Sequence, residues 1–242
     1  MKQEIAKREW KTHFGDEREF LDKYFSTYYS PENLIINTDN LDDDFIYMSL
    51  IVRYSYKYFS DIIPIAYVTA VLTNPEFRNK GYFRIAMQKV FESMISQDYI
   101  LSCLIPATDE LTQTYLRYGY SNCFIDEQNA DSHKSIVHHE KTITLYKELG
   151  YNLSLLMPNR NGMIRIINVE KVIEIYARYN PEITKTYKII DSQISNNNNK
   201  VIEICSGKST LVTKSNDFQE IIISDLASQI FNDSYMDKMF DQ

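Results

Sequence analysis

The chain has 242 residues, a formal net charge of −7 and a hydrophobic share of 44%. That share is ordinary for a globular protein and excludes a disordered chain. The acidic balance argues against a general nucleic-acid binder, and no apolar run reaches the roughly 18 residues that a membrane helix needs. The length suits one large domain or two small ones.

Cysteine usage and the first residues point to the cytoplasm. The three cysteines are widely spaced and form no Cys-x-x-Cys pair, so neither a disulfide framework nor a zinc knuckle is indicated. The first ten residues are charged and lack the apolar stretch of a secretory signal. His133, His138 and His139 lie close to Glu140, but in such a polar segment solvated histidines are commoner than a metal site. We therefore expect no metal.

Hydrophobic spacing predicts alternating helices and strands in the first half of the chain. The expected order of strand, turn, helix, strand and helix is typical of an α/β fold. The expected elements are a helix over 16–29, strands over 34–37, 45–53, 56–59 and 65–73, a helix up to about 97, a strand over 99–105 and a helix over 112–118.

The pattern changes after a cluster of proline, asparagine and glycine at 158–162. We therefore predict two domains, residues 1–150 and residues 151–242. In the second domain we expect strands over 163–167, 183–190, 201–205, 210–213 and 218–223, with helices over 169–177 and 226–231.

The segment that carries chemistry leads from a buried strand into a short basic loop and then a helix. Such a loop turns backbone N–H groups toward one point at the helix N-terminus, which suits a pyrophosphate. Gly81 allows a close approach of the backbone, and Arg78 and Lys80 add positive charge. The loop is neither a Walker loop nor a dinucleotide fingerprint. Taken by itself, it is equally compatible with a solvated basic turn.

The residues around this loop resemble the GCN5-related N-acetyltransferase (GNAT) superfamily. The string from Val71 to Gly81 is similar to the family's V-x-T-x-P-x-x-R-x-x-G, and 115–120 is similar to its Y-x-R-F-G-Y/F string. Phe83, followed by Arg84, replaces the small residue that ends the family's loop, as in the enhanced-intracellular-survival (Eis) branch.

The resemblance implies a GNAT fold, with a central mixed sheet flanked by helices, and an acetyl-CoA-dependent N-acetyltransferase. It implies that Tyr115 is the general acid, although a tyrosine that merely packs on the sheet is the plain alternative. It also implies a small-molecule or peptide amine as acceptor. From the net charge and the lack of a long apolar run we expect neither a nucleic-acid nor a membrane partner. The implied cofactor-binding residues are Val71, Leu72, Thr73, Arg78, Asn79, Lys80, Gly81, Tyr82 and Phe83.

A second resemblance begins at Gly162, where Gly-Met-Ile-Arg-Ile-Ile-Asn looks like the opening of the sterol-carrier-protein-like α+β domain that ends Eis-type chains. In that branch the C-terminal carboxylate is the base, which here implies Gln242, and homo-oligomers are common. The interval of about 40 residues before Gly162 implies that the branch's degenerate middle domain is missing or reduced. The rival reading is an acyl-CoA or lipid binding protein without turnover.

Overall fold

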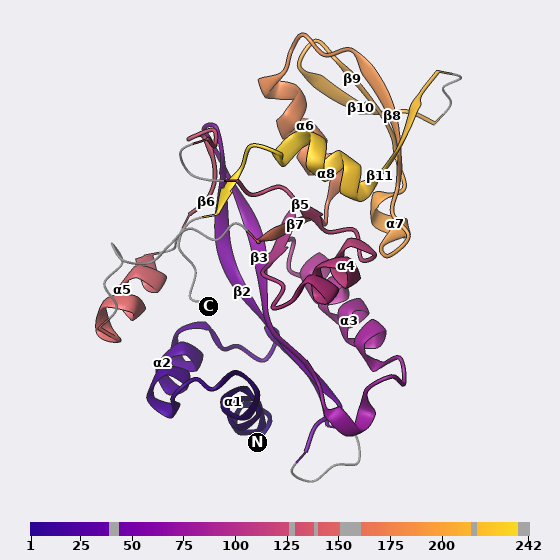
Figure 1. Cartoon of the computed structure of the whole chain (residues 1–242). Helices are drawn as coiled ribbons and strands as arrows, with labels where there is room; N and C mark the ends of the chain where they lie inside the picture. Colours follow the sequence, from indigo (N-terminus) through magenta and orange to yellow (C-terminus); the bar gives the residue numbers. More distant parts are fainter. Residues whose placement is uncertain (39–43, 126–128, 138–139, 151–160, 214–216, 237–242) are drawn as a thin grey trace. The chain divides into compact units, whose positions relative to one another are not determined.

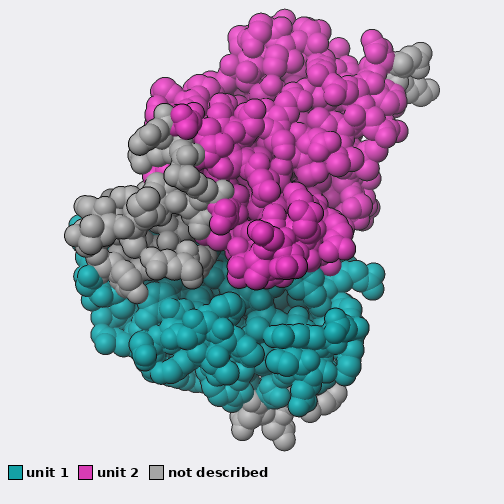
Figure 2. Space-filling view, viewed as in Figure 1, with its two compact units in different colours: residues 1–54, 66–97, 138–156 teal, residues 55–65, 98–137, 157–242 magenta. Residues whose placement is uncertain are grey.

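The computed structural model describes residues 1–38, 44–125, 129–137, 140–150, 161–213 and 217–236. Its contacts divide the chain into two compact units, which are teal and magenta in Figure 2. The first unit comprises residues 1–54, 66–97 and 138–156, and the second comprises residues 55–65, 98–137 and 157–242. No helix in the described ranges is long and apolar enough to cross a membrane.

The first unit contains the N-terminal helices and the long helix α3 (Figure 1). Trp10 of α1 packs edge-on against Tyr24 and Phe25 of α2, with ring centroids 5.2 and 5.9 Å apart. Its elements are α1 (Lys2–Phe14), α2 (Arg18–Tyr28), β1 (Leu34–Asn37), the first part of β2 (Tyr47–Tyr58), the last part of β3 (Asp61–Thr73), the 3₁₀ helix η1 (Pro75–Phe77), α3 (Tyr82–Ser96) and α5 (Glu140–Glu148).

The second unit contains the other parts of β2 and β3 and every later strand that the structure describes. Its further elements are β4 (Leu101–Leu104), α4 (Asp109–Leu116), β5 (Ser121–Asn122), β6 (Lys134–Val137), β7 (Met163–Ile166), α6 (Val169–Tyr179), β8 (Lys185–Ile190), α7 (Ser195–Asn198), β9 (Val201–Cys205), β10 (Lys208–Leu211), β11 (Gln219–Ile222), α8 (Ile223–Phe231) and β12 (Tyr235–Met236).

Several elements differ from the sequence-based expectation: β5, β6, α5, α7 and β12 were not expected, and α1 and β2 show the reasons most clearly. Helix α1 was not expected, because only Ile5, Ala6 and Trp10 are both apolar and buried in a segment that is otherwise charged. Strand β2 is continuous where two strands were expected, because its second half, from Ser55 to Tyr58, pairs with β6. In both cases a distant partner decides the local structure.

The larger sheet is mixed, with the strand order β12–β6–β2–β3–β4–β7–β5 and with β1 paired to β2. Most pairs for which a register is established are antiparallel, whereas β12 runs parallel to β6. Strand β7 lies between β4 and β5, with Cys103 of β4 and Ser121 of β5 both opposite Ile164. The expected mixed α/β fold is thus confirmed.

The smaller sheet belongs entirely to the second unit and has the order β10–β9–β8–β11. Alternate residues of β8 and β9 are buried, as in a sheet that is covered on one face. Helix α6 packs against β9 and β10, and α8 packs against β11. The buried strand residues are Tyr187, Ile189, Ile202, Ile204 and Ile221.

Strand β7 was expected to open the second domain, but it pairs with β4 and β5 of the larger sheet. The larger sheet therefore continues beyond residue 150, and the smaller sheet begins only at Lys185. The division into domains 1–150 and 151–242 stays a prediction.

The Tyr67 hydroxyl group, on β3 in the first unit, is buried without a hydrogen-bond partner in the described part of the chain. Its ring lies 5.5 Å from that of Tyr54, centroid to centroid. By contrast, the hydroxyl of Tyr28 in the same unit donates to Oγ1 of Thr142 over 2.6 Å. A buried hydroxyl without a partner costs roughly 1–3 kcal/mol.

Tyr67→Phe removes this hydroxyl and keeps the ring. We expect the free energy of unfolding to rise by about 1 kcal/mol and Tm by about 2–4 °C. Tyr28→Phe is the matched control, because its hydroxyl is hydrogen-bonded, and it should lower Tm. Thermal unfolding followed by circular dichroism measures both variants. A lower Tm for Tyr67→Phe would contradict the expectation.

Candidate active site

The loop that follows β3 in the first unit is held at its base by Asn74. The side-chain amide of Asn74 donates to Oδ1 of Asp44 over 3.1 Å and to the carbonyl of Phe45 over 2.9 Å. Its own Oδ1 accepts the N–H of Glu76 over 3.1 Å and so caps η1. These bonds fix where the chain leaves β3 and enters the loop.

At the tip of the loop, backbone N–H groups point to no acceptor within the described part of the chain. Asn79 and Gly81 are left-handed, with φ of 60° and 84°. The N–H groups of Lys80, Gly81 and Tyr82 form no hydrogen bond with any residue that the structure describes. Unpaired N–H groups at a helix N-terminus, together with the helix dipole, are an anion-binding arrangement.

Positive side chains surround these N–H groups. Arg78, Lys80 and Arg84 are exposed, and α3 has no acidic residue in its first turn. Nε of Arg78 donates to the carbonyl of Thr73 over 3.1 Å, which folds this side chain back toward β3. Nζ of Lys80 lies 5.3 Å from the ring centroid of Phe77. The donor set therefore fits an anion such as a pyrophosphate.

A close approach of the backbone was expected at Gly81, but the structure supports only a conformational reason for glycine at this position. A Cβ atom there would meet nothing within 4 Å, so the position does not need glycine for space. Glycine is favoured there because of the positive φ, which strains a residue with a side chain. The open space beside Gly81 is free for a ligand.

Strand β3 contains a feature that sequence reasoning misses. Ala70 is left-handed inside the strand, with φ of 50°, directly before Val71, Leu72 and Thr73. Left-handed residues within strands are typical of β-bulges, which interrupt the ladder and leave backbone groups available. Nothing in the sequence marks this position, because alanine seldom adopts the left-handed conformation.

Tyr115 lies near the end of α4, in the second unit. The helix begins at Thr108, whose hydroxyl accepts the N–H of Leu111 over 3.3 Å. Tyr115 is 5% exposed, and its ring meets that of Tyr120 edge-on with centroids 5.8 Å apart. Burial raises the pKa of Tyr115 above its ordinary value, so this hydroxyl stays protonated at neutral pH.

The turn after α4 connects these two tyrosines through the backbone. The N–H groups of Tyr118 and Tyr120 both donate to the carbonyl of Tyr115, over 2.9 and 3.2 Å. The hydroxyl of Tyr120 is held by Ser102 of β4 over 2.8 Å. Gly119, between them, has a φ of 79°. The position of Tyr115 thus depends on this turn.

Other predicted residues fall outside this arrangement. Gln242, His138 and His139 lie outside the described residues. His133 is exposed, and its Nδ1 lies 2.9 Å from Oδ1 of Asp131. Within the described ranges, no group of three or more histidine, cysteine, aspartate or glutamate side chains is placed to hold a metal ion.

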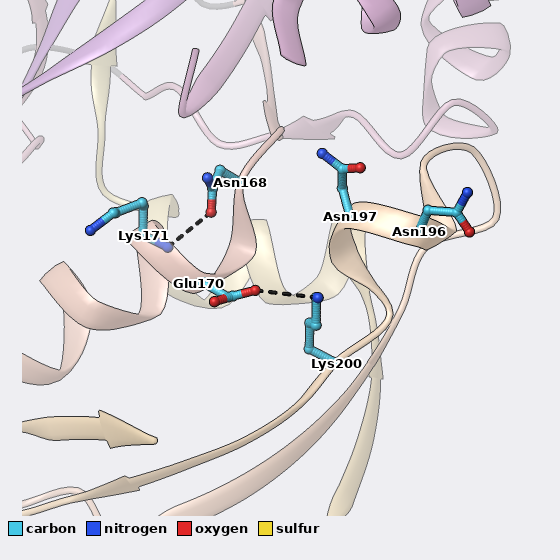
Figure 3. Close-up of a pocket in the computed structure, with 6 residues that line it drawn as sticks. All are labelled: Asn168, Glu170, Lys171, Asn196, Asn197 and Lys200. Carbon is cyan, nitrogen blue, oxygen red and sulfur yellow. Dashed lines mark hydrogen bonds and ion pairs between the residues drawn. The ribbon is translucent and has the colours of Figure 1, made fainter. Parts of the chain in front are cut away.

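A hollow of about 310 Å³ lies in the second unit, at the start of α6, and Figure 3 shows the residues that line it. Two pairs of its lining residues are bonded to each other. Asn168 accepts the N–H of Lys171 over 3.1 Å and caps α6, and Glu170 forms an ion pair of 3.3 Å with Lys200. None of the sequence-predicted site residues lines this hollow, so it adds nothing to the candidate active site.

A family model of an acetyltransferase (GNAT) domain matches residues 3–123, which is half of the chain. The chain belongs to the GNAT acetyltransferase family. It is an enzyme of the N-acetyltransferase class, and the GNAT family uses acyl-CoA as donor. The loop after β3 and Tyr115 both lie within the matched residues.

Solved structures are similar to this GNAT chain over most of its length. A conserved protein of unknown function from Enterococcus faecalis V583 has a TM-score of 0.65 at 14% identity, covering 98% of this chain and 97% of that one. Eis1 from Mycobacterium abscessus has a TM-score of 0.63 at 10% identity, covering 89% and 88%. A GCN5-related N-acetyltransferase from Anabaena variabilis has a TM-score of 0.61 at 16% identity, covering 93% of this chain and 85% of that one. Identities this low establish a shared fold alone, and no curated protein matches the chain.

Gly81 and Gly119 of the GNAT chain offer a matched pair for mutation. Both have positive φ, but a Cβ at Gly119 would collide with the guanidinium of Arg165 and lie 2.8 Å from Cγ2 of Ile223. We expect Gly81→Ala to lower the free energy of unfolding by about 1 kcal/mol, through backbone strain alone. Gly119→Ala should cost about 1–3 kcal/mol more, because Arg165 has to move. Urea denaturation measures both; equal losses would mean that Arg165 adjusts freely.

Proposed function

We propose that this GNAT chain transfers the acetyl group of acetyl-CoA to an amine of a small molecule or peptide. The observation that carries the proposal is the cluster of unpaired N–H groups at the start of α3, among three exposed cations. Such a cluster suits a pyrophosphate. Because the chain belongs to a family that uses acyl-CoA as donor, we assign this pyrophosphate to acyl-CoA.

The chain's own residues supply the two parts of the donor site in the first unit. The N–H groups from Asn79 to Phe83, with Arg78 and Lys80, hold the pyrophosphate. Backbone groups of Val71, Leu72 and Thr73 hold the pantetheine arm and the thioester carbonyl. The left-handed conformation of Ala70 supports the second role, because backbone groups next to a bulge are less committed to the sheet.

Acetyl-CoA supplies an acetyl group activated as a thioester. Transfer forms a bond between the amine nitrogen and the carbonyl carbon and breaks the carbon–sulfur bond. Tyr115 donates its hydroxyl proton to the sulfur, so that the thiol can leave, and a base takes one proton from the amine. The raised pKa of Tyr115 keeps that proton in place at neutral pH.

We propose the C-terminal carboxylate, at Gln242, as the base. The chain is anchored shortly before it: β12 pairs with β6, Met236 is buried, and Nζ of Lys134 lies 2.9 Å from both carboxylate oxygens of Asp233. A terminal carboxyl has an ordinary pKa of about 3.5, so it is ionised at neutral pH and can accept a proton.

We also propose that the chain belongs to the Eis-like branch and that residues 151–242 include a sterol-carrier-protein-like domain. The likeness to Eis1 over 89% of the chain supports the first proposal. The smaller sheet packed against α6 and α8 supports the second, because it is an α+β arrangement of the expected kind.

We propose a cytoplasmic location because the three cysteines are free thiols. Cys103 and Cys123 are buried free cysteines and Cys205 is an exposed one, which suits a reducing compartment. Assembly into a homo-oligomer stays a prediction.

Release of CoA from acetyl-CoA, measured with polyamines, aminoglycosides and lysine peptides in turn, tests the function. We expect release that depends on an amine. Tyr115→Phe keeps the ring and removes the acid, so kcat should fall by about 10²- to 10⁴-fold. The KM for acetyl-CoA should stay the same, because the donor loop is intact.

Tyr187→Phe is the control for this experiment. Tyr187 is a buried tyrosine of the smaller sheet, and its hydroxyl accepts a hydrogen bond from Gln229 over 2.6 Å. Its loss should leave kcat unchanged. If acetyl-CoA binds but no amine promotes CoA release, the protein is an acyl-CoA binding protein instead.

The proposed base is tested by moving the terminal carboxylate. Removing residues 240–242 should abolish acetyl transfer while CoA still binds, as isothermal titration calorimetry would show. Gln242→Ala is the matched control, because it changes the side chain and keeps the carboxylate in place, and it should retain kcat. Unchanged turnover in the shortened chain would contradict the assignment of the terminal carboxylate as the base.

A further inference from the structure

A buried ion pair in the second unit joins β7 to the loop before α7. Arg165 and Asp191 are fully buried, and Nη2 of Arg165 donates to both carboxylate oxygens of Asp191, over 2.8 and 2.6 Å. The flanking residues of β7, Met163, Ile164 and Ile166, are apolar and buried. A charged side chain in such a strand needs a reason, because moving it out of water is costly.

Asp191 is itself fixed by the loop that carries it. Its Oδ1 accepts the N–H groups of Gln193 and Ile194, over 2.9 and 3.2 Å. Its Oδ2 accepts the side-chain amide of Asn198 over 3.0 Å, and its N–H donates to Oδ1 of Asn199 over 2.6 Å. The carboxylate that holds Arg165 is therefore a rigid partner.

The other side of Arg165 faces the turn after α4. Its Nη1 donates to the carbonyl of Tyr118, and its guanidinium occupies the space where a Cβ of Gly119 would lie. Nε2 of Gln193, from the same loop as Asp191, donates to the carbonyl of Arg117 over 3.2 Å. Two consecutive carbonyls at the end of α4 thus receive their hydrogen bonds from this network.

The same turn determines where Tyr115 lies. The carbonyl of Tyr115 accepts the N–H groups of Tyr118 and Tyr120, and the two rings of Tyr115 and Tyr120 are in contact. Arg165 also acts on Tyr120 electrostatically, since its positive charge opposes the rise in the pKa of that phenol. Moving the guanidinium would move the turn and, through it, the hydroxyl of Tyr115.

We infer that Arg165, held by Asp191, is a positioning residue for Tyr115. The inference rests on the proposed role of Tyr115 as the general acid. A buried ion pair is seldom the most stable choice for a core, since apolar residues of similar volume often serve as well. Here the guanidinium of Arg165 fixes a geometry, because this planar group binds the carboxylate of Asp191 on one side and the carbonyl of Tyr118 on the other.

The test uses the double variant Arg165→Met with Asp191→Asn in the full chain. It removes both charges together, so no unpaired charge remains in the core, and the amide oxygen introduced by Asp191→Asn can still accept the N–H groups of Gln193 and Ile194. We expect kcat for acetyl transfer to fall by about 10- to 100-fold, because small displacements of a reacting group have effects of this size. The KM for acetyl-CoA should change less than about threefold, because the donor loop is untouched.

Amide hydrogen exchange supplies a readout that is independent of turnover. In the double variant, the N–H groups of Tyr118 and Tyr120 should exchange faster, while those of β8 and β9 keep their protection. Gln193→Ala is the milder companion, because this exposed side chain donates to the carbonyl of Arg117 and otherwise to its neighbour Ser192. It should give a smaller change of the same kind, and it remains informative if the double variant fails to fold.

The possible outcomes separate the two proposals. If Tyr115→Phe loses activity while the folded double variant keeps its kcat and its exchange pattern, the pair is merely structural and the inference is wrong. If the double variant fails to fold, unchanged kcat and exchange in Gln193→Ala overturn the inference. If Tyr115→Phe keeps full activity, the general-acid assignment has failed, and faster exchange at Tyr118 still establishes the support of the turn.

Discussion

The contact between Arg165 and Asp191 is the constraint on which the described second unit depends. Neither group reaches water, so neither can lose the other without leaving a buried charge. Because each also binds backbone groups, the pair ties together strand β7, the end of α4 and the loop before α7. These segments are far apart in the sequence, and each depends on the others for its position. The pair thereby links the loop after β8 to the turn that follows Tyr115, the proposed general acid.

The two parts of the candidate site are built in different ways. The donor loop is mostly local: Gly81 supplies a left-handed turn, and the unpaired N–H groups lie at the start of α3. Only its base needs a distant partner, because Asn74 is bonded to Asp44 and Phe45. Tyr115 depends on long-range contacts, because Ser102 of β4 holds its neighbour Tyr120, and Arg165 of β7 holds the turn between them. A short segment of sequence is enough to specify most of the first part, but the second requires most of the unit to be folded.

This difference explains what the sequence predicts well. The strand, loop and helix around Gly81, and the helix that carries Tyr115, follow from hydrophobic spacing and short motifs, and the mixed α/β fold follows from their order. The left-handed conformation of Ala70 could not be predicted, since alanine seldom adopts it. The sequence did contain a signal for Arg165, a lone cation inside an apolar strand, but not the identity of its partner 26 residues later. Long-range pairings such as that of β2 with β6 cannot be predicted from local sequence, because they form only when the whole sheet is assembled.

The place of β7 has a consequence for the order in which the protein is made. Strands β4 and β5 are translated well before β7, yet β7 lies between them. Until residue 166 has left the ribosome, each of these strands keeps an open edge that any extended chain can pair with. Pairing β4 directly with β5 would close the gap and shut β7 out. The long polypeptide between β5 and β7 therefore sets a waiting time during synthesis, in which the nascent chain is most exposed to mispairing and to the chaperones that prevent it.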